Sequence, residues 1–247
     1  ITTLRGVSLN GGTLTLNAAG AVTQSSAITG NTTVVKNGAG TFTLSQNNTY
    51  TGATNINAGT LALGAANRIA DTSAVTVASG ATFNLANFAE TVGSLAGAGN
   101  VTLGSATLTA GGNNTSTIFS GVASGTGGLT KAGTGTLTLS GANTYTGATT
   151  INAGTLTATG GSAIADNSQV TLANAAGATL NLTNNETIGN LSGGGATGGN
   201  VALGANTLTV NEPGATTYSG VVSGTGGLTK AGAGTLTLGR INTYTGA

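Results

Sequence analysis

The sequence contains no cysteine, histidine, methionine or tryptophan, and only 4% of its 247 residues are charged. Without histidine and cysteine there is no histidine-based catalytic triad, no thiolate nucleophile and no usual zinc site. Without cysteine there is also no disulfide framework. Aromatic residues make up 3% of the chain and apolar residues 38%, so the apolar side chains are mostly small. Such side chains can fill a narrow core but not a wide one.

The few charges are nearly balanced, with six Lys and Arg against five Asp and Glu and a net charge of +1. Binding to nucleic acid requires clustered cations, and binding to single strands also requires aromatic platforms, so no nucleic-acid partner is expected. No run approaches the ~18 apolar residues of a membrane-spanning helix, so no transmembrane segment is expected in this stretch. No cofactor or metal is expected either, because phosphate-loop and calcium-binding glycine motifs are missing.

What the chain does contain is a long internal repeat. Residues 34–64, 127–160 and 226–247 share one pattern, marked by Lys36, Lys131 and Lys230. The similarity continues between these segments, so the repeating unit is about 95 to 99 residues long. We therefore divide the 247 residues of one continuous domain into a tail of a preceding unit, two whole units and the start of another: residues 1–35, 36–130, 131–229 and 230–247.

Within each unit, apolar and polar residues alternate over short stretches, as in the Thr-Leu-Thr-Leu sequence of residues 136–139. This period of two is typical of a half-buried strand, and the Gly, Asn and Asp residues between stretches favour turns. Sandwiches and barrels also have short, evenly spaced strands. Repetition along the whole chain instead favours an all-β, right-handed parallel β-helix (a β-solenoid) with about three short strands per rung. Roughly 24 residues per rung would give four rungs per unit, a rise of ~19 Å.

The alternation also predicts which residues form the core. In the second full unit we expect nine residues inside, with the flanking threonines outside: Leu137, Leu139, Ile151, Leu156, Leu180, Leu182, Leu191, Leu203 and Leu208. Their counterparts in the first unit are expected to stack in register with them, four rungs away: Phe42, Leu44, Ile56, Leu61, Phe83 and Leu85.

The sequence of residues 125–156, GTGGLTKAGTGTLTLSGANTYTGATTINAGTL, resembles the autotransporter-associated β-strand repeat, also called the passenger-associated transport repeat. The resemblance extends over almost the whole chain, less clearly over residues 1–33. Proteins of this family are large type V secreted proteins of Gram-negative bacteria. The resemblance implies a secreted, surface-displayed passenger domain, exported through the outer membrane by a C-terminal barrel that would lie beyond residue 247.

The repeated tyrosines and lysines are the candidate surface-contact residues, because they recur near the same part of each unit: Tyr50, Tyr145, Tyr244, Lys36, Lys131 and Lys230. The tyrosines could stack on a carbohydrate, or they could cover the coil edge in a turn that Asn caps and Gly permits. The lysines could form a ligand stripe, or they could be solvated residues that discourage sideways strand pairing.

No catalytic residues are predicted. Asp71 and Asp166 form one repeat-equivalent pair of acids, and Glu90 and Glu186 form another. A separation of ~19 Å is too large for paired glycosidase carboxylates, which sit ~5–9.5 Å apart. Asp71 is expected to be a solvated turn residue rather than a partner of Glu90. A polysaccharide-degrading enzyme and an ice-binding protein remain remote alternatives, the latter because the outward threonine rows are interrupted.

The function expected from the sequence is a non-catalytic stalk, fibre or adhesin segment of a bacterial surface protein. The alternative is a repeat-based module that binds glycans or surfaces weakly and many times over, without a deep pocket. Partners would be neighbouring rungs of a longer chain or filament, and host-cell surfaces, abiotic surfaces or glycans. Because neither residues 1–10 nor residues 240–247 look like a polar cap, we expect the sequence to be part of a longer chain or filament.

Overall fold

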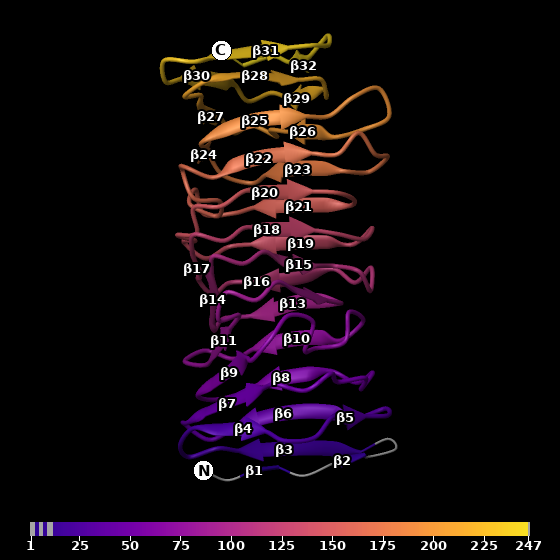
Figure 1. The fold of residues 1–247 in the computed structure, drawn as a ribbon. Coiled ribbons are helices and arrows are strands. Elements are labelled where there is room, and N and C mark those ends of the chain that lie inside the picture. Colours follow the sequence, from indigo (N-terminus) through magenta and orange to yellow (C-terminus); the bar gives the residue numbers. More distant parts are fainter. Residues whose placement is uncertain (1–2, 5–6, 9–11, 247) are drawn as a thin grey trace.

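The computed structural model describes residues 3–4, 7–8 and 12–246. These residues form 32 short strands and no helix, and every strand pairing given for them is parallel. The strands lie in stacked turns along one axis, with the N-terminal turns at one end and the C-terminal turns at the other (Figure 1). The predicted parallel β-solenoid is therefore confirmed.

The strands form five sheets. The 12-stranded sheet contains β3 (Thr13–Asn17), β6 (Thr33–Asn37), β8 (Thr54–Ile56), β10 (Ala74–Val77), β13 (Ser94–Gly97), β16 (Thr117–Phe119), β19 (Thr136–Leu139), β21 (Thr155–Ala158), β23 (Thr179–Leu182), β26 (Asn200–Ala202), β29 (Val222–Gly224) and β32 (Thr243–Tyr244). The eight-stranded sheet contains β12 (Glu90–Val92), β15 (Leu108–Ala110), β18 (Leu129–Lys131), β20 (Thr149–Ile151), β22 (Gln169–Leu172), β25 (Asn190–Gly193), β28 (Ala215–Tyr218) and β31 (Thr235–Leu238). The seven-stranded sheet contains β1 (Thr3–Leu4), β4 (Val22–Gln24), β7 (Thr41–Leu44), β9 (Thr60–Leu63), β11 (Thr82–Asn84), β14 (Asn100–Gly104) and β17 (Ala123–Gly125). The two smaller sheets are β2 (Val7–Ser8) with β5 (Ile28–Thr29), and β24 (Glu186–Ile188) with β27 (Leu208–Asn211) and β30 (Leu228–Ala231).

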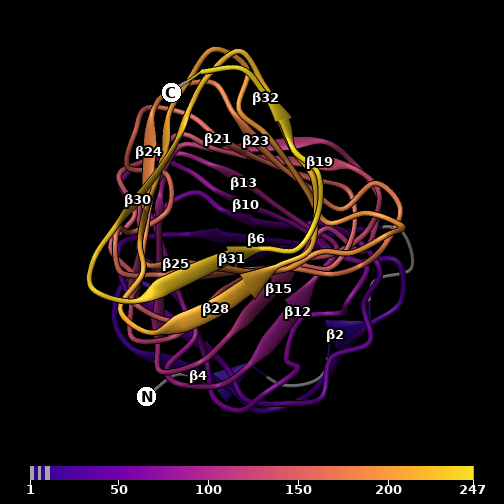
Figure 2. The same ribbon diagram turned by 90° about the horizontal axis from the view of Figure 1, so that it is seen from above.

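Each turn has three faces, which enclose one narrow interior when seen along the axis (Figure 2). The 12-stranded sheet forms one face throughout. Each of the other two faces is made of two sheets, as the chain order of the strands shows. On one face the three-stranded sheet follows the seven-stranded sheet in the later turns, and on the other the pair β2–β5 precedes the eight-stranded sheet. Paired residues on successive turns, such as Val34 with Thr54, are usually about 20 positions apart. A turn is thus shorter than the 24 residues expected.

The repeating unit does not contain a whole number of turns. Strand β6, which holds Lys36, is separated from β19 by five steps of the 12-stranded sheet. Strand β18, which holds Lys131, lies one face before β19, in the eight-stranded sheet. The unit therefore spans five turns less one face, or about 4⅔ turns, a rise of ~22 Å. Consequently, the prediction that equivalent residues stack in register four rungs apart is wrong.

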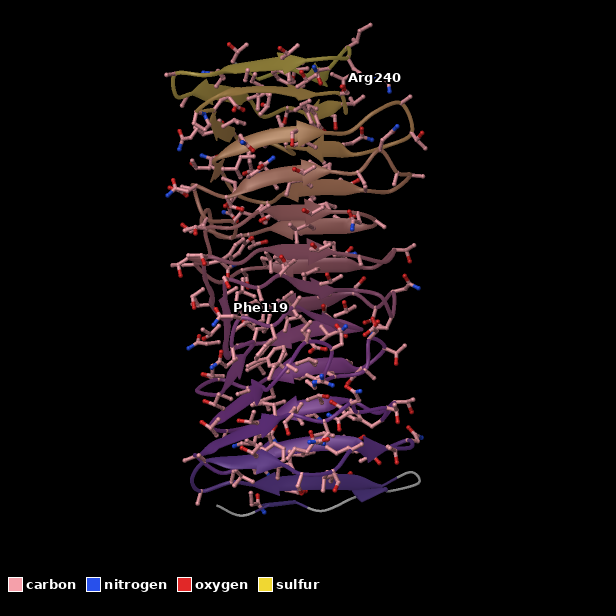
Figure 3. The ribbon with its side chains drawn as sticks, viewed as in Figure 1. Phe119 and Arg240 are labelled. Carbon is pink, nitrogen blue, oxygen red and sulfur yellow. The ribbon has the colours of Figure 1, made fainter. Side chains whose placement is uncertain are left out.

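The core prediction itself is confirmed. All fifteen residues named from the alternation are buried, none more than 3% exposed. Thr136 and Thr138, which flank Leu137, are half-buried on the outer side. Phe119, buried at 0% exposure, lies within the stack, whereas Arg240 lies on the last turn (Figure 3). Because leucine and threonine alternate with period two, one side of every strand faces the interior.

Candidate functional site

The tyrosines of the first two marker segments, Tyr50 and Tyr145, lie inside the solenoid. Tyr50 is 0% exposed, and its hydroxyl lies 2.7 Å from Oγ1 of Thr54. Oγ1 of Thr54 lies 3.0 Å from Oγ of Ser73, which in turn donates to the carbonyl of Gly52 at 2.8 Å. Burial raises the pKa of the Tyr50 phenol well above its ordinary value. A ring held in this way cannot stack on a sugar at the surface.

The second unit repeats this network on a different face. Tyr145 is 0% exposed and lies 2.7 Å from Oγ1 of Thr149. Thr149 contacts Ser168 at 3.0 Å, and Ser168 donates to the carbonyl of Gly147 at 2.8 Å. Burial raises the pKa of the Tyr145 phenol to about 12. The network therefore belongs to the repeating unit and not to one face of the solenoid.

The lysines of the first two marker segments are also buried. Lys36 is 0% exposed, and its Nζ donates to the carbonyls of Asn37, Gly38 and Ala58 at 2.8, 2.7 and 3.0 Å. Ala58 belongs to the next turn, so the ammonium joins two turns. The expectation of a solvated lysine at the coil edge is therefore wrong here, because the backbone supplies three acceptors inside the corner.

Lys131 has the same arrangement, with its Nζ donating to the carbonyls of Ala132, Gly133 and Ala153 at 2.5, 2.7 and 3.1 Å. Burial lowers the pKa of Lys131 to about 8, so the side chain is still protonated at neutral pH. Lys230, in the last turn, is exposed and donates only to the carbonyl of Gly232, at 2.8 Å. Tyr244, on the same turn, is half-buried. Of the six candidate contact residues, Lys230 and Tyr244 are the two that no described later turn covers, and their role in contact stays a prediction.

Two glutamates bind the backbone of the preceding turn. Glu90 is 1% exposed and accepts the N–H groups of Arg68 and Ile69 at 2.8 and 3.1 Å. Burial raises its pKa to about 7, against the opposing effect of these two hydrogen bonds, and the charge of Asp71 adds to the rise. Asp71 itself is exposed, as expected.

Glu186 occupies the equivalent place, is 2% exposed, and accepts the N–H groups of Ala163 and Ile164 at 3.3 and 2.9 Å. Burial raises the pKa of Glu186 to about 7 as well. Both carboxylates thus satisfy backbone donors in segments that contain no strand, residues 64–73 and 159–168.

In each unit, an asparagine also joins two turns. It lies one turn before the backbone segment that the glutamate binds, and it bonds that segment and the preceding turn. Asn48 Oδ1 accepts the N–H of Ile28 at 2.8 Å, and its Nδ2 donates to the carbonyl of Arg68 at 2.8 Å. Asn143 does the same between Ala123 and Ala163, at 2.7 and 2.6 Å. A column of side chains therefore replaces strand pairing at the irregular positions of each unit.

The chemistry that this buried cluster can perform is limited. Its tyrosine, lysine, glutamate and asparagine groups are bonded chiefly to the backbone or to short hydroxyls, and none of those bonds joins a nucleophile to a base. Within residues 12–246, no three Asp or Glu side chains lie close enough to hold a metal ion. In the same stretch, no helix is long and apolar enough to span a bilayer. We therefore read the cluster as a means of joining turns.

The outer faces carry no charged side chain on any described strand except Lys230, since the other strand lysines and glutamates are buried. On the eight-stranded sheet, the central outward residue of every strand carries a hydroxyl group. The residues in this row are Thr91, Thr109, Thr130, Thr150, Thr171, Ser192, Thr217 and Thr237. The row is a single file and not a broad array, and it spans seven rises, ~34 Å.

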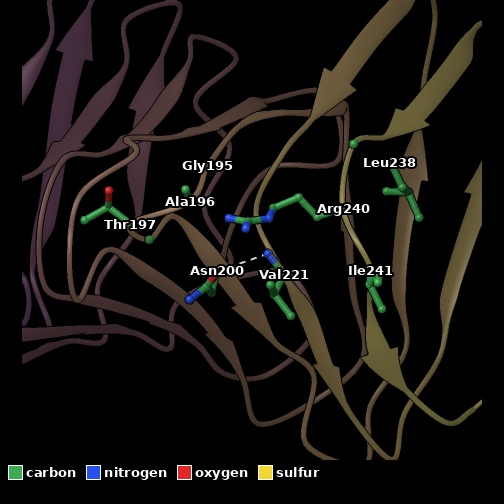
Figure 4. Close-up of a pocket in the computed structure, with 10 residues that line it drawn as sticks. Gly195, Ala196, Thr197, Asn200, Val221, Leu238, Arg240 and Ile241 are labelled. Atoms are coloured by element: carbon green, nitrogen blue, oxygen red, sulfur yellow. Dashed lines mark hydrogen bonds between the residues drawn. The ribbon is translucent and has the colours of Figure 1, made fainter.

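A cavity of about 650 Å³ lies at one corner of the last turns. It is bounded by the loop between β25 and β26 and by Gly239, Arg240 and Ile241 (Figure 4). The cavity is largely open to solvent, so the expectation of no deep pocket stays a prediction. At the same corner of the earlier turns, Gly121 lies against the backbone of Gly99, and Gly141 lies against the backbone of Gly121.

Comparison with known proteins finds a matching repeat family and a similar adhesin. The passenger-associated-transport-repeat family matches residues 34–63, 129–158 and 228–247. These segments contain the lysines and tyrosines described above. The chain is also 41% identical over 137 residues to the "Adhesin BmaC autotransporter" of Brucella suis biovar 1 (strain 1330). That alignment covers 54% of this chain and 4% of the relative's length. No solved structure matches the chain.

Proposed function

We propose that this chain, which carries passenger-associated transport repeats, is a non-catalytic segment of an autotransporter passenger that works outside the cell as an adhesive stalk. The observation that carries the proposal is that the sequence repeats of this family form the turns of a continuous β-solenoid. The three matched segments are successive parts of one uninterrupted stack of turns. The similarity to an autotransporter adhesin supports the adhesive part.

The architecture suits a stalk because its length grows with the number of turns. One 12-stranded sheet runs through the described chain, which gives a rod of about 55 Å at ~4.8 Å per turn. Each turn contacts only its neighbours, so units can be added without changing the rest. The buried lysines, asparagines and glutamates bond adjacent turns to each other and keep the irregular segments in the stack.

Adhesion can be tested on the chain itself. Beads coated with the folded chain should attach to cultured mammalian cells more often than beads coated with albumin at the same density. A variant lacking residues 36–130 is the matched control, because Val35 and Thr130 are repeat-equivalent and the junction preserves the pattern. It removes one unit of 4⅔ turns and should retain attachment per unit of surface.

Two results would count against the proposal. Attachment equal to that of albumin at every coating density would contradict the adhesive part. Loss of the solenoid on deletion of residues 36–130, seen as loss of the far-ultraviolet β signal, would contradict the additive stalk.

A further inference from the structure

The two full units differ most at one corner of the solenoid. In the first unit, strands β13 and β14 are joined by only two residues, 98–99. In the second unit, the equivalent strands β25 and β26 are joined by six, residues 194–199. The connection between β22 and β23 is also longer, by two residues, than that between β10 and β11. Figure 1 shows these loops reaching beyond those beside β18, β19, β20 and β21 on the same side.

A second departure lies two turns above the first. From the first unit into the start of the second, this corner is a stack of glycines: a Cβ at Gly121 would lie 1.7 Å from the oxygen of Gly99, and one at Gly141 would lie 1.8 Å from the oxygen of Gly121. In the later turns Gly220 still stacks on Gly199, but Arg240, at the start of the next unit, stands in the place of Gly141 of the second unit. Gln46 holds the equivalent position in the first unit.

The enlarged loop is held in place by its own contacts. Tyr218, which replaces Phe119, donates its hydroxyl to the carbonyl of Gly199 at 2.6 Å. The N–H of Thr197 is bonded to Oδ1 of Asn174 at 2.8 Å, and Asn174 belongs to the other lengthened connection. Changes that are far apart in sequence thus meet in space and support one another around a cavity of about 650 Å³.

The cavity has a defined chemistry. Arg240 is its one charged lining residue, and its side chain extends across the opening toward Ala196 and Thr197 (Figure 4). Within the described residues, the guanidinium of Arg240 has no hydrogen-bond or ion-pair partner. Thr197 adds a hydroxyl, and Ile241, 89% exposed, adds an apolar surface. The volume falls within the ~300–1,000 Å³ typical of small-ligand sites.

We propose that this corner binds a carboxylate-bearing sugar, with the carboxylate on Arg240 and the sugar ring between the 194–199 loop and Ile241. An unpaired guanidinium offers two parallel N–H donors, which match a carboxylate in a bidentate pair. The inference rests on the proposed adhesive function and gives it a ligand class. Because the first unit lacks the loop and the arginine, the site is specific to the second unit and the turns that follow it.

The test is a titration of the isotope-labelled chain, followed by the amide resonances of residues 194–199 and 239–241. The probes are 3′-sialyllactose, a hyaluronan tetrasaccharide and lactose, each up to about 10 mM, a range that detects weak single-site binding. The first two probes distinguish sialic acid from a uronic acid, and lactose lacks the carboxylate. At least one acidic probe should shift these resonances, and lactose should not.

Two variants sharpen the test. Arg240→Gly introduces the residue found at the equivalent position of the second unit, Gly141, and should weaken binding of the acidic probe by about tenfold or more, as expected for the loss of a charged hydrogen-bonded pair. Arg68→Gln removes one positive charge from an inner turn outside the cavity and should leave binding unchanged. Absence of binding by both acidic probes, equal binding of lactose, or unchanged binding by Arg240→Gly would each overturn the site.

Bead attachment separates this inference from the proposed function. If parent beads adhere and Arg240→Gly beads adhere equally well, the sugar site is not the adhesive surface, while the adhesive stalk stands. If parent beads fail to adhere although the titration succeeds, the adhesive function falls and the sugar site stands. We expect fewer attached beads with Arg240→Gly.

Discussion

The first and second full units share their buried clusters but differ at one outer corner. Lys36 and Lys131 bind three carbonyls each, with distances that agree within about 0.3 Å, although they lie on different faces. The corner that holds Gly99 and Gly121 in the first unit carries a six-residue loop in the second, and Arg240 of the following unit lines the same cavity as that loop. The interior of the repeat is therefore tightly constrained by the fold, whereas one corner can change without disturbing the stack.

The largest expected effect concerns the tyrosines. Tyr145→Ala should lower the free energy of unfolding by about 3–5 kcal/mol, because it empties a fully buried site. Tyr145→Phe should cost only about 1 kcal/mol, since it removes one hydrogen bond. Tyr244→Ala, at a half-buried site on the last turn, should cost less than Tyr145→Ala. Urea unfolding measures all three free energies. If Tyr145→Ala and Tyr244→Ala lowered the free energy of unfolding equally, the inner tyrosine would not be more important for stability than the tyrosine of the last turn.

The buried glutamates predict a pH dependence. In the folded chain burial raises the pKa of Glu186 to about 7, above its ordinary value of 4.5. The folded state then binds the proton more tightly than the unfolded state. The stability contributed by Glu186 is thus full below about pH 4.5 and is lost as the pH rises through about 7, by up to about 3 kcal/mol.

Glu186→Gln should remove this part of the pH profile. The exposed Asp166→Asn, which removes a smaller contribution to the raised pKa of Glu186, should only shift the profile toward lower pH. Urea midpoints measured between pH 4 and pH 8 give the comparison. Parallel profiles for the parent and Glu186→Gln would show that the carboxyl does not titrate in this window.

Comparison of two lysines gives a smaller effect. Lys131→Met leaves three buried carbonyls without a donor and should cost about 1–3 kcal/mol. Lys230→Met, at an exposed site with one carbonyl partner, should change stability by less than about 0.5 kcal/mol. Native-state hydrogen exchange of residues 129–158 should show the loss of stability in Lys131→Met as faster exchange in this segment. A cost for Lys230→Met equal to that for Lys131→Met would contradict the role assigned to the three-carbonyl corner.

The alternation of leucine and threonine was sufficient to predict the class of fold and the core, because period two decides which side of a strand is buried. The prediction of a right-handed coil follows from the general preference of parallel crossovers. The repeat period did not reveal the length of a turn, since one unit includes segments without strands and ends one face short of five turns.

The buried polar residues were missed for a related reason. The backbone of Arg68 is bonded by Asn48 from the turn before and by Glu90 from the turn after. These residues lie about one turn apart, a spacing of 20 to 22 residues. Once the length of a turn is known, this spacing becomes a usable signal. The corner cavity required the structure, because its loop and Arg240 are brought together only by the stacking of turns.

The central claim is that a unit of about 4⅔ turns places equivalent residues on different faces. Engineered cysteines test it directly, since the sequence has no cysteine of its own. Thr109 and Thr130 are paired across β15 and β18 at the junction of the two units. The Thr109→Cys/Thr130→Cys chain should therefore form an intramolecular disulfide under mild oxidation, whereas Ile118→Cys/Thr130→Cys should not, because Ile118 pairs with Thr138 on another face. Cross-linking of residues 118 and 130 without cross-linking of 109 and 130 would contradict the offset of one face per unit.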